Sequence, residues 1–156
     1  MKRRKLYKFL LVFMIVVSFF LLIPETLWSE SSLRKEEKDQ IACIAKGIFF
    51  EAGNQSELGK IAVGHVILSR MRIKHMTACE VIYEKDSKGR KQFLWDHAAI
   101  VTIRDERYVK SLEVAKNLKK TEDPTNGALY FHNIHVKPHW KNLQKTVQIE
   151  GHVFYK

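Results

Sequence analysis

Hydrophobic positions between residues 41 and 50 recur at the spacing of one helix face. Apolar side chains stand at offsets of 0, 3, 4, 7 and 8 from the first, namely Ile41, Ile44, Ala45, Ile48 and Phe49. This spacing is typical of an amphipathic helix. We expect the helix to run from about Glu36 to Ala52, with Gly53 and Asn54 forming a left-handed cap.

A second apolar stretch follows Ser56, which is a suitable N-cap with Glu57 in the first turn of a helix. It continues to Met71 and is apolar on nearly all sides, as expected for a central buried helix. A short helix is predicted over residues 77–83 and another over residues 105–120. The last has four inward-facing side chains, Tyr108, Leu112, Ala115 and Leu118.

After Pro124 the pattern changes from helical to strand-like. Short runs of β-branched and aromatic residues predict strands at 127–132, 147–149 and 152–155, with Glu150 and Gly151 as the turn between the last two. The fold class is therefore expected to be α+β, mainly helical, with a small antiparallel sheet near the C-terminus.

The N-terminus has the pattern of a membrane-targeting segment. Residues 1–5 are basic after Met1, and residues 9–23 form an apolar run that only Ser18 interrupts. This order is typical of export. We therefore expect a signal peptide or signal anchor over residues 1–24, a polar linker over 25–38 and an exported domain over 39–156, which is long enough for one core.

No clear cleavage site follows the apolar run, which favours an uncleaved anchor in the cytoplasmic membrane. The domain would then face the periplasm or cell wall, and it would be secreted if the signal is cleaved. The formal charge is +10, and five of the 27 basic residues lie in the first eight positions. The remaining excess suits an anionic partner such as a wall polymer or a lipid surface. Export argues against nucleic acid.

The two cysteines, Cys43 and Cys79, are expected to form a disulfide, because an even pair outside the cytoplasm is usually oxidised. The alternative is two buried free thiols.

Glu51 is the first candidate for chemistry. It lies seven residues past Ile44 and three past Ile48, on the apolar side of the predicted helix. Burial and the negative end of the helix dipole both disfavour the carboxylate and should raise its pKa. A carboxylic acid that stays protonated near neutrality can act as a general acid. The alternative is a half-exposed, solvated carboxylate at a helix end.

Two other segments combine aromatic rings with amides and imidazoles. One is 92–97, with Gln92 and Trp95, and the other is 130–140, with Tyr130, His132 and Trp140. Such mixtures are typical of sugar-binding grooves, where rings cover the apolar faces of pyranoses. Core packing is the alternative for Phe93, Phe131 and Phe154.

A metal site is a weaker interpretation of the second segment. His132, His135 and His139 have a spacing that could bind zinc, but the run contains Pro138 and lacks the H-E-x-x-H arrangement of zinc peptidases. We therefore expect no metal and no cofactor.

The order of several motifs resembles the SleB/CwlJ-type cell wall hydrolases. The residues that carry the resemblance are 44–52, 59–71, 79–83, 92–95, 123–132 and 151–155. It implies a lysozyme-related, lytic-transglycosylase-like fold and cleavage of peptidoglycan glycan strands. By this resemblance, Glu51 would be the acid and then the base at the bond between N-acetylmuramic acid and N-acetylglucosamine. Substrate-binding residues would be Gln55, Gln92, Trp95, Tyr130 and His132.

The sequence departs from the family pattern at two places. The usual E-A-R-G-E stands here as residues 51–55, in which the arginine is missing and Gln55 replaces the second acid, and the usual Q-F-S-W has Leu94 in place of serine. Gln55 can bind a sugar hydroxyl but cannot transfer a proton, which favours a mechanism with one acid. A non-catalytic wall-binding module is the alternative function, and a zinc-dependent amidase or peptidase is a further one.

Overall fold

The computed structural model describes residues 13–14, 25–86, 89, 91–93, 101 and 104–156. Contacts divide the chain into two units, 1–37 and 38–156, and the second unit contains the fold described below.

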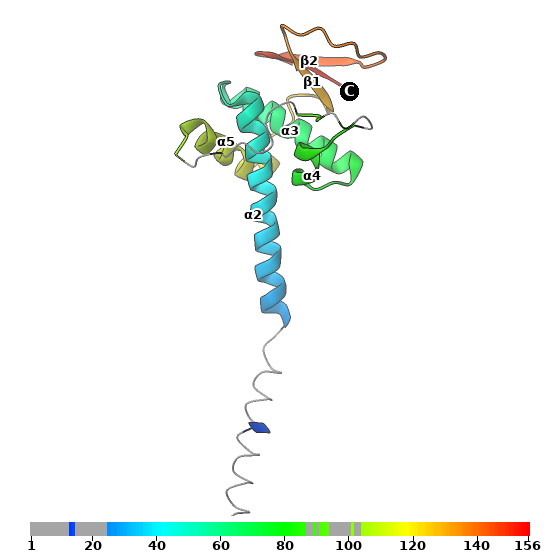
Figure 1. The fold of residues 1–156 in the computed structure, drawn as a ribbon. Helices are drawn as coiled ribbons and strands as arrows, with labels where there is room; N and C mark the ends of the chain where they lie inside the picture. Colours follow the sequence, from blue (N-terminus) through cyan, green and yellow to red (C-terminus); the bar gives the residue numbers. More distant parts are fainter. Residues whose placement is uncertain (1–12, 15–24, 87–88, 90, 94–100, 102–103) are drawn as a thin grey trace, which may run out of the picture. The chain divides into compact units, whose positions relative to one another are not determined.

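The described helices are α2 (Glu25–Ala52), α3 (Glu57–Lys74), α4 (Ala78–Tyr83) and α5 (Glu106–Asn117), the last followed by the 3-10 turn η1 (Leu118–Lys120). All four predicted helices are present (Figure 1). The expected start of the first helix near Glu36 is wrong, because α2 begins at Glu25. Residues 25–38 contain neither glycine nor proline, and Arg34 pairs with Glu30 one turn earlier, so nothing interrupts the helix there.

The end of α2 also differs from the expectation. Neither Gly53 nor Asn54 adopts a left-handed backbone. The Gly53 amide instead donates to the Phe49 carbonyl at 3.0 Å, and a Cβ at residue 53 would collide with that oxygen. Glycine is therefore needed for a close approach of the backbone rather than for a positive φ.

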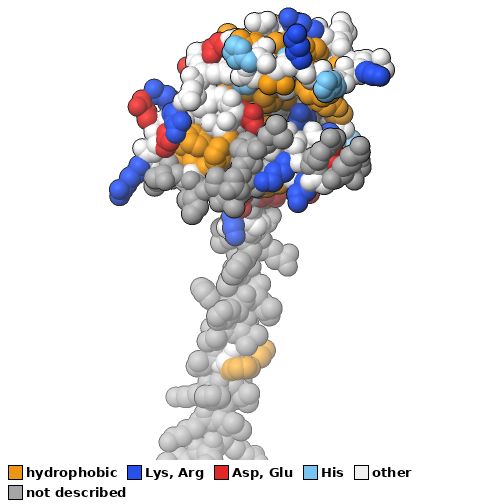
Figure 2. Space-filling model, turned by 45° about the horizontal axis from the view of Figure 1, so that its top comes forward, with side chains coloured by type: hydrophobic (Ala, Val, Ile, Leu, Met, Phe, Trp, Pro, Cys, Tyr) orange, Lys and Arg blue, Asp and Glu red, His pale blue; other side chains and the backbone are white. Residues whose placement is uncertain are grey.

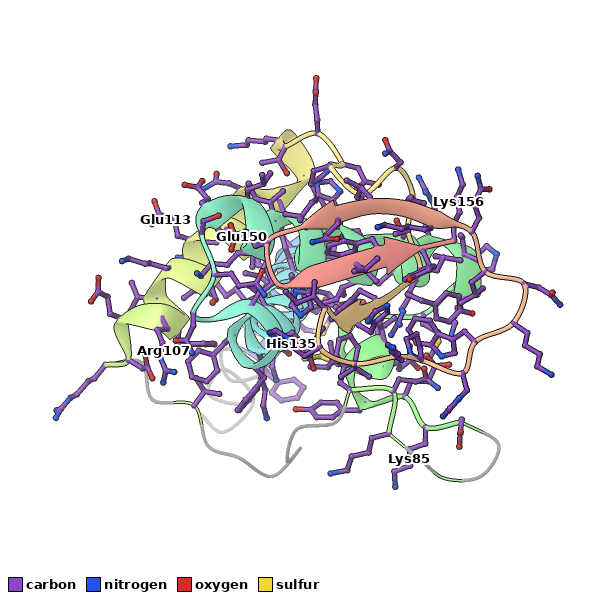
Figure 3. All side chains as sticks on the ribbon, turned by 90° about the horizontal axis from the view of Figure 1, so that it is seen from above. Lys85, Arg107, Glu113, His135, Glu150 and Lys156 are labelled. Carbon is purple, nitrogen blue, oxygen red and sulfur yellow. A yellow bond between two sulfur atoms is a disulfide. The ribbon has the colours of Figure 1, made fainter. Side chains whose placement is uncertain are left out.

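The N-terminus of α3 is joined to the sheet. Ser56 is the N-cap, as predicted, but its side chain makes no capping bond and instead donates to the carboxylate of Glu150. The Ser56 amide donates to the same carboxylate at 3.1 Å. Figure 3 shows Glu150 at the turn between the second and third strands of the sheet, beside the beginning of α3.

Two reciprocal hydrogen bonds stabilise the N-terminus of helix α4. Thr77 accepts from the Glu80 amide, and the Glu80 carboxylate accepts from the Thr77 amide, which together form a capping box. The predicted disulfide between Cys43 and Cys79 is present and joins α2 to α4.

The three strands are β1 (Tyr130–Asn133), β2 (Lys145–Ile149) and β3 (His152–Tyr155). They form an antiparallel sheet in the order β1-β3-β2. The first strand begins at Tyr130, three residues later than predicted, because the amides of residues 127 and 128 donate within the turn that follows Asp123. The sheet lies at one end of the helical body, across α3 (Figure 1).

Helix α3 is the centre of the domain, and it packs in two directions. Val63 and Ile67 belong to the larger core with α2, α4 and α5. Ala62 and Val66 belong to a smaller core under the sheet, with Phe154. The two sets lie on different faces of one helix, so burial of both explains why its sequence is apolar on nearly all sides.

The predicted N-terminal membrane segment, 1–24, lies outside the described residues except for Phe13 and Met14. Within the part of the chain that the structure describes, no helix has the length and apolarity to cross a membrane.

Candidate functional site

A cleft of about 600 Å³ lies where the end of α2, the C-terminal part of α3 and the strand β1 meet. Its polar lining consists of Glu51, Arg70, Gln92, His132, Asn133 and His152. Its hydrophobic and aromatic lining consists of Phe93, Tyr130, Phe131, Val136, Pro138 and Trp140. Figure 2 shows histidine and hydrophobic side chains gathered at this end of the domain, with basic side chains around them.

Glu51 lies one residue before the end of α2 and lines this cleft. Its side chain is half-buried. Burial raises the pKa of its carboxyl from 4.5 to about 7, and the nearby Arg70 guanidinium opposes part of that rise. A half-buried acid with a pKa near neutrality can both donate and accept a proton at physiological pH.

Arg70 is a cleft residue that the sequence analysis did not single out. It lies on α3 and is almost fully buried, and its Nε donates to the Leu129 carbonyl at 2.7 Å. The guanidinium lies 5.2 Å from the centre of the Phe93 ring and 5.7 Å from that of Tyr130. Its Nη1 is buried and has no partner among the described residues. Arg70 thus supplies a fixed positive charge near Glu51.

Tyr130 and His132 line the cleft and belong to an aromatic cluster with Trp140 and Tyr155. The ring of Trp140 lies 5.8 Å from both Tyr130 and His132. His132 stacks on Tyr155 at 5.4 Å. Because its Nδ1 must donate to the Asn133 carbonyl at 2.8 Å, its Nε2 accepts from the Tyr155 hydroxyl at 3.1 Å. Both nitrogens are occupied, so His132 presents mainly its ring to the cleft.

Gln92 also lines the cleft and is exposed, whereas its neighbour Phe93 is buried. The core-packing interpretation of Phe93 and Phe154 is confirmed, since both are almost fully buried. Trp95 lies outside the described residues.

Gln55 is not part of the cleft lining. Its side chain lies behind the cleft, with Nε2 2.9 Å from Nδ1 of His152, and it lines a separate cavity of about 430 Å³ between α3 and α5. The Gln55 amide thus contacts a residue that lines the cleft, and the expected contact of Gln55 with substrate stays a prediction. Residue 55 lies beside β3 because the chain turns after α2, where the Gly53 amide donates to the Phe49 carbonyl and the Gln55 amide to the Ala52 carbonyl.

Two signals in the sequence could have identified the missed residues. Arg70 lies seven residues past Val63 and three past Ile67, on an apolar side of its helix, and a charge there needs a buried partner or a function. His152 lies two residues before the core residue Phe154 on the same strand. Because alternate residues of a strand point to one face, this spacing predicts an inward-facing imidazole.

The three histidines considered as zinc ligands do not gather. Among the described residues, which include His132, His135 and His139, no group of three or more His, Cys, Asp or Glu side chains could hold a metal ion. His135 is exposed and its amide donates to the Asn133 side chain.

Comparison with known protein families identifies the family of this chain. The sequence pattern of the cell wall hydrolase family matches residues 54–155, beginning three residues after Glu51. No curated protein matches the chain.

Two solved structures share the fold. One is the catalytic domain of the Bacillus cereus SleB protein, with 22% identity and a TM-score of 0.57, covering 76% of this chain and 91% of that one. The other is the catalytic domain of the germination-specific lytic transglycosylase SleB from Bacillus anthracis, with 22% identity and a TM-score of 0.54, covering 75% and 93%. The chain belongs to the cell wall hydrolase family.

Proposed function

We propose that this cell wall hydrolase is a peptidoglycan-cleaving glycosidase of the lytic transglycosylase type, with Glu51 as its single acid and base. The observation that carries the proposal is the position of Glu51. It is half-buried in a cleft of about 600 Å³ lined by aromatic rings and hydrogen-bonding groups, and burial raises its pKa to about 7. The name of the similar Bacillus anthracis structure supports the same type of reaction.

The proposed reaction has two proton transfers through one carboxyl group. Protonated Glu51 donates its proton to the glycosidic oxygen between N-acetylmuramic acid and N-acetylglucosamine while the bond from C1 to that oxygen breaks. The C6 hydroxyl oxygen of the muramoyl residue then bonds to C1, and the Glu51 carboxylate accepts the proton that this hydroxyl loses. The products are a shortened strand and a 1,6-anhydromuramoyl end, and no water is consumed.

The chain supports a route with one acid. Among the described residues that line the cleft, Glu51 is the only carboxylate. Glycosidases that use water generally need a second carboxylate as base or nucleophile. Gln55, which replaces the second acid of the family motif, cannot serve as either. Arg70 would stabilise the Glu51 carboxylate between the two proton transfers, since it is a nearby buried cation.

The rest of the cleft would bind the glycan strand. Rings of Tyr130, His132 and Trp140 provide apolar faces for sugar rings, and Gln92 provides hydrogen bonds. Trp95, from the motif 92–95, is proposed as a further wall of the groove on the sequence pattern alone. No cofactor or metal is required by these steps.

The proposal is tested by the products. We would incubate the full chain with purified peptidoglycan and identify released fragments by mass spectrometry. The parental protein should release fragments with 1,6-anhydromuramic acid ends, and Glu51→Gln should release at least about 100-fold less. Glu37→Gln is the matched control, because it makes the same change at an exposed position of the same helix.

Each other outcome identifies a different function. Reducing-end products would mean that water attacks and that the protein is a hydrolysing glycosidase. Retention on peptidoglycan without any release by the folded parental protein would identify a wall-binding module. Inhibition by a chelator together with loss of activity in His135→Ala would favour a zinc-dependent amidase or peptidase.

We further propose that the protein is exported and anchored in the cytoplasmic membrane, where it would face the periplasm or cell wall. The basic residues 2–5 followed by the apolar run 9–23 support this location. The basic excess of the remaining chain suits a partner with carboxylates, such as the peptide stems of peptidoglycan, and nucleic acid is not a proposed partner.

A further inference from the structure

We propose that His152 binds the glycan by donating a hydrogen bond from Nε2 into the cleft, and that Gln55 is the positioning residue that fixes this tautomer. The inference rests on the proposed function, because it assigns two more residues to the same site. It gives a role to the amide that replaces the second acid of the family motif.

The geometry places the two side chains in direct contact. His152 is the first residue of β3, is 5% exposed, and lines the cleft that contains Glu51. Its ring lies edge-on to Phe131, with centroids 4.9 Å apart. Its Nδ1 lies 2.9 Å from Nε2 of Gln55, across 97 residues of sequence.

The Gln55 side chain has room for this contact because residue 59 is glycine. A Cβ at Gly59 would lie 2.8 Å from the Gln55 Cβ and would collide with its Oε1. The side chain is thus confined between the first turn of α3 and the ring of His152. Its Oε1 is buried and has no hydrogen-bond partner among the described residues, so the contact with His152 is the polar contact that orients the amide.

The identities of the two atoms determine where the proton of His152 lies. An amide nitrogen can only donate a hydrogen bond, so Nδ1 of His152 must accept it. A neutral imidazole that accepts at Nδ1 has its proton on Nε2. Nε2 lies on the edge of the ring away from Gln55, so the ring offers the cleft an N–H donor. An oxygen of a bound sugar, such as a hydroxyl or an acetamido carbonyl, is the acceptor that fits.

The surroundings keep this imidazole uncharged. Burial lowers the pKa of His152, and His132, on the neighbouring strand β1, acts in the same direction. Glu150, in the turn before β3, opposes them. The Glu150 carboxylate is engaged by Ser56, which limits its effect on the ring. A neutral His152 adds no positive charge to the cleft, which helps Glu51 to keep its proton.

A carboxylate at position 55 would produce a different site. Glutamate there would accept a hydrogen bond from Nδ1, place a proton on that nitrogen and favour the imidazolium. That cation would stabilise the Glu51 carboxylate and lower the pKa of Glu51. Glutamine in place of glutamate at position 55 thus keeps the pKa of Glu51 higher, so Glu51 stays protonated to a higher pH.

The first measurement reads the tautomer directly and needs no activity. We would label the histidines of the full chain with ¹⁵N and record long-range proton–nitrogen spectra of the imidazoles, assigning His152 by loss of its signals in His152→Gln. We expect an Nε2–H tautomer with an unprotonated Nδ1. Protonation of Nδ1 instead would mean that the Gln55 amide presents its oxygen, and it would overturn the proposal.

Two substitutions at position 55 test the positioning role. In Gln55→Glu the pKa of His152 should rise by at least about one unit, and the alkaline limb of the pH–activity profile should move to lower pH. In Gln55→Met, which keeps the length but removes the donor, the tautomers should mix and kcat/KM should fall by about tenfold. Asn54→Asp is the matched control, because it adds the same charge at an exposed neighbouring position. An unchanged tautomer and pH profile in both Gln55 variants would overturn the role of Gln55.

Substitutions of His152 itself test the direction of the donor. Glutamine places its amide nitrogen where Nε2 stands, whereas asparagine places it where Nδ1 stands. His152→Gln should therefore retain most of the glycan binding. His152→Asn should raise KM about tenfold, with a smaller effect on kcat. Equal loss in both variants would overturn the assignment.

A last experiment distinguishes failure of this inference from failure of the proposed function. A tetrasaccharide of alternating N-acetylglucosamine and N-acetylmuramic acid is added to labelled Glu51→Gln, which cannot cleave it. A shift of the His152 Nε2 resonance supports the donor, and no shift at saturating tetrasaccharide overturns it. Failure of the parental protein to cleave peptidoglycan would refute the glycosidase but would leave the tautomer measurement intact.

Discussion

Burial of the Glu51 carboxyl costs the folded state free energy whenever that group is ionised. Its pKa is about 7 in the folded protein against 4.5 when it is not buried. The folded state therefore binds the proton more tightly, and this residue makes the free energy of unfolding fall as the pH rises from 4.5 to 7. The full effect is at most about 3 kcal/mol.

Glu51→Gln should consequently stabilise the protein while removing its activity. Above pH 7 the variant should exceed the parental free energy of unfolding by up to about 3 kcal/mol, and the two should converge below pH 4.5. Urea unfolding at pH 8 and pH 4 measures the difference, with Glu37→Gln as the control that should change neither value. Equal stabilities at pH 8 would show that the carboxyl is not destabilised by its site.

Arg70 should set the upper limit of the working pH range. Its positive charge lowers the pKa of Glu51, so its removal should raise that pKa and move the alkaline limb of the activity profile to higher pH. Arg70→Met is the test, because it keeps much of the buried volume, and Arg70→Lys retains the charge as the control. A limb that does not move in Arg70→Met, in protein with the parental circular dichroism spectrum, would remove Arg70 from this role.

The sequence predicted the position of Glu51 more reliably than that of Gln55, and the reason is the range of the contacts that determine each position. The position of Glu51 depends on helical spacing over ten residues, which local pattern determines. The position of Gln55 depends on how the chain turns at Gly53 and on where β3 lies, 97 residues later. Contacts of that range come from packing, so the sequence pattern did not predict the contact between Gln55 and His152.

The disulfide between Cys43 and Cys79 is an element-scale feature, because it joins two helices. It closes a loop of 36 residues, which reduces the conformational freedom of the unfolded chain. Cys43→Ala/Cys79→Ala should lower the free energy of unfolding by about 3–4 kcal/mol in urea titrations. A reductant should destabilise the parental protein similarly and have no effect on the double variant. A reductant effect on the double variant would mean that something other than this bond is responsible.

Helix α3 depends on a small residue where it meets the 3-10 turn η1. A Cβ at Gly64 would lie 2.8 Å from Leu118 Cδ2 and 3.2 Å from Ile48 Cδ1. Gly64→Ala should therefore cost about 1–3 kcal/mol of stability by overpacking, even though alanine is the better helix former. Urea unfolding measures the loss.

A double-substitution cycle shows whether the contact with Leu118 is the cause. Leu118→Ala removes the two carbons that the new Cβ would meet, so the cost of Gly64→Ala should shrink in that background. The same cost in both backgrounds would contradict overpacking at this contact.

The predicted elements agree with the structure wherever burial created the pattern. The helices over 57–74 and 106–117 and the strands at the C-terminus are amphipathic or fully buried, and each was predicted within a few residues. The start of α2 was missed because residues 29–39 are all exposed, so no hydrophobic period marks them. Helix propensity and surface ion pairs determine that part of the helix, and neither leaves a periodic signal.

At the scale of the whole molecule, charge is expected to influence how the protein meets its substrate. The basic residues outside the first eight positions outnumber the acidic ones by 22 to 17. Around the cleft, lysines at positions 137, 141 and 145 are exposed next to the aromatic cluster. This distribution would favour association with peptidoglycan, which carries carboxylates on its stems, and the association should weaken as salt screens the charges.

The N-terminal segment leads to the last prediction, which concerns the location of the chain. An apolar run of 15 residues at 9–23 behind basic residues should keep the protein in the membrane fraction after an alkaline carbonate wash. The intact mass of the recovered protein should include residues 1–24. Val16→Arg should release a large share of the chain, because a central arginine costs insertion about 2.5–3.5 kcal/mol. Val109→Arg, the same change at an exposed position of α5, should release none. A mass that begins after residue 24 would instead mean that the segment is a cleaved signal peptide, and the domain would then reach the wall as a free enzyme.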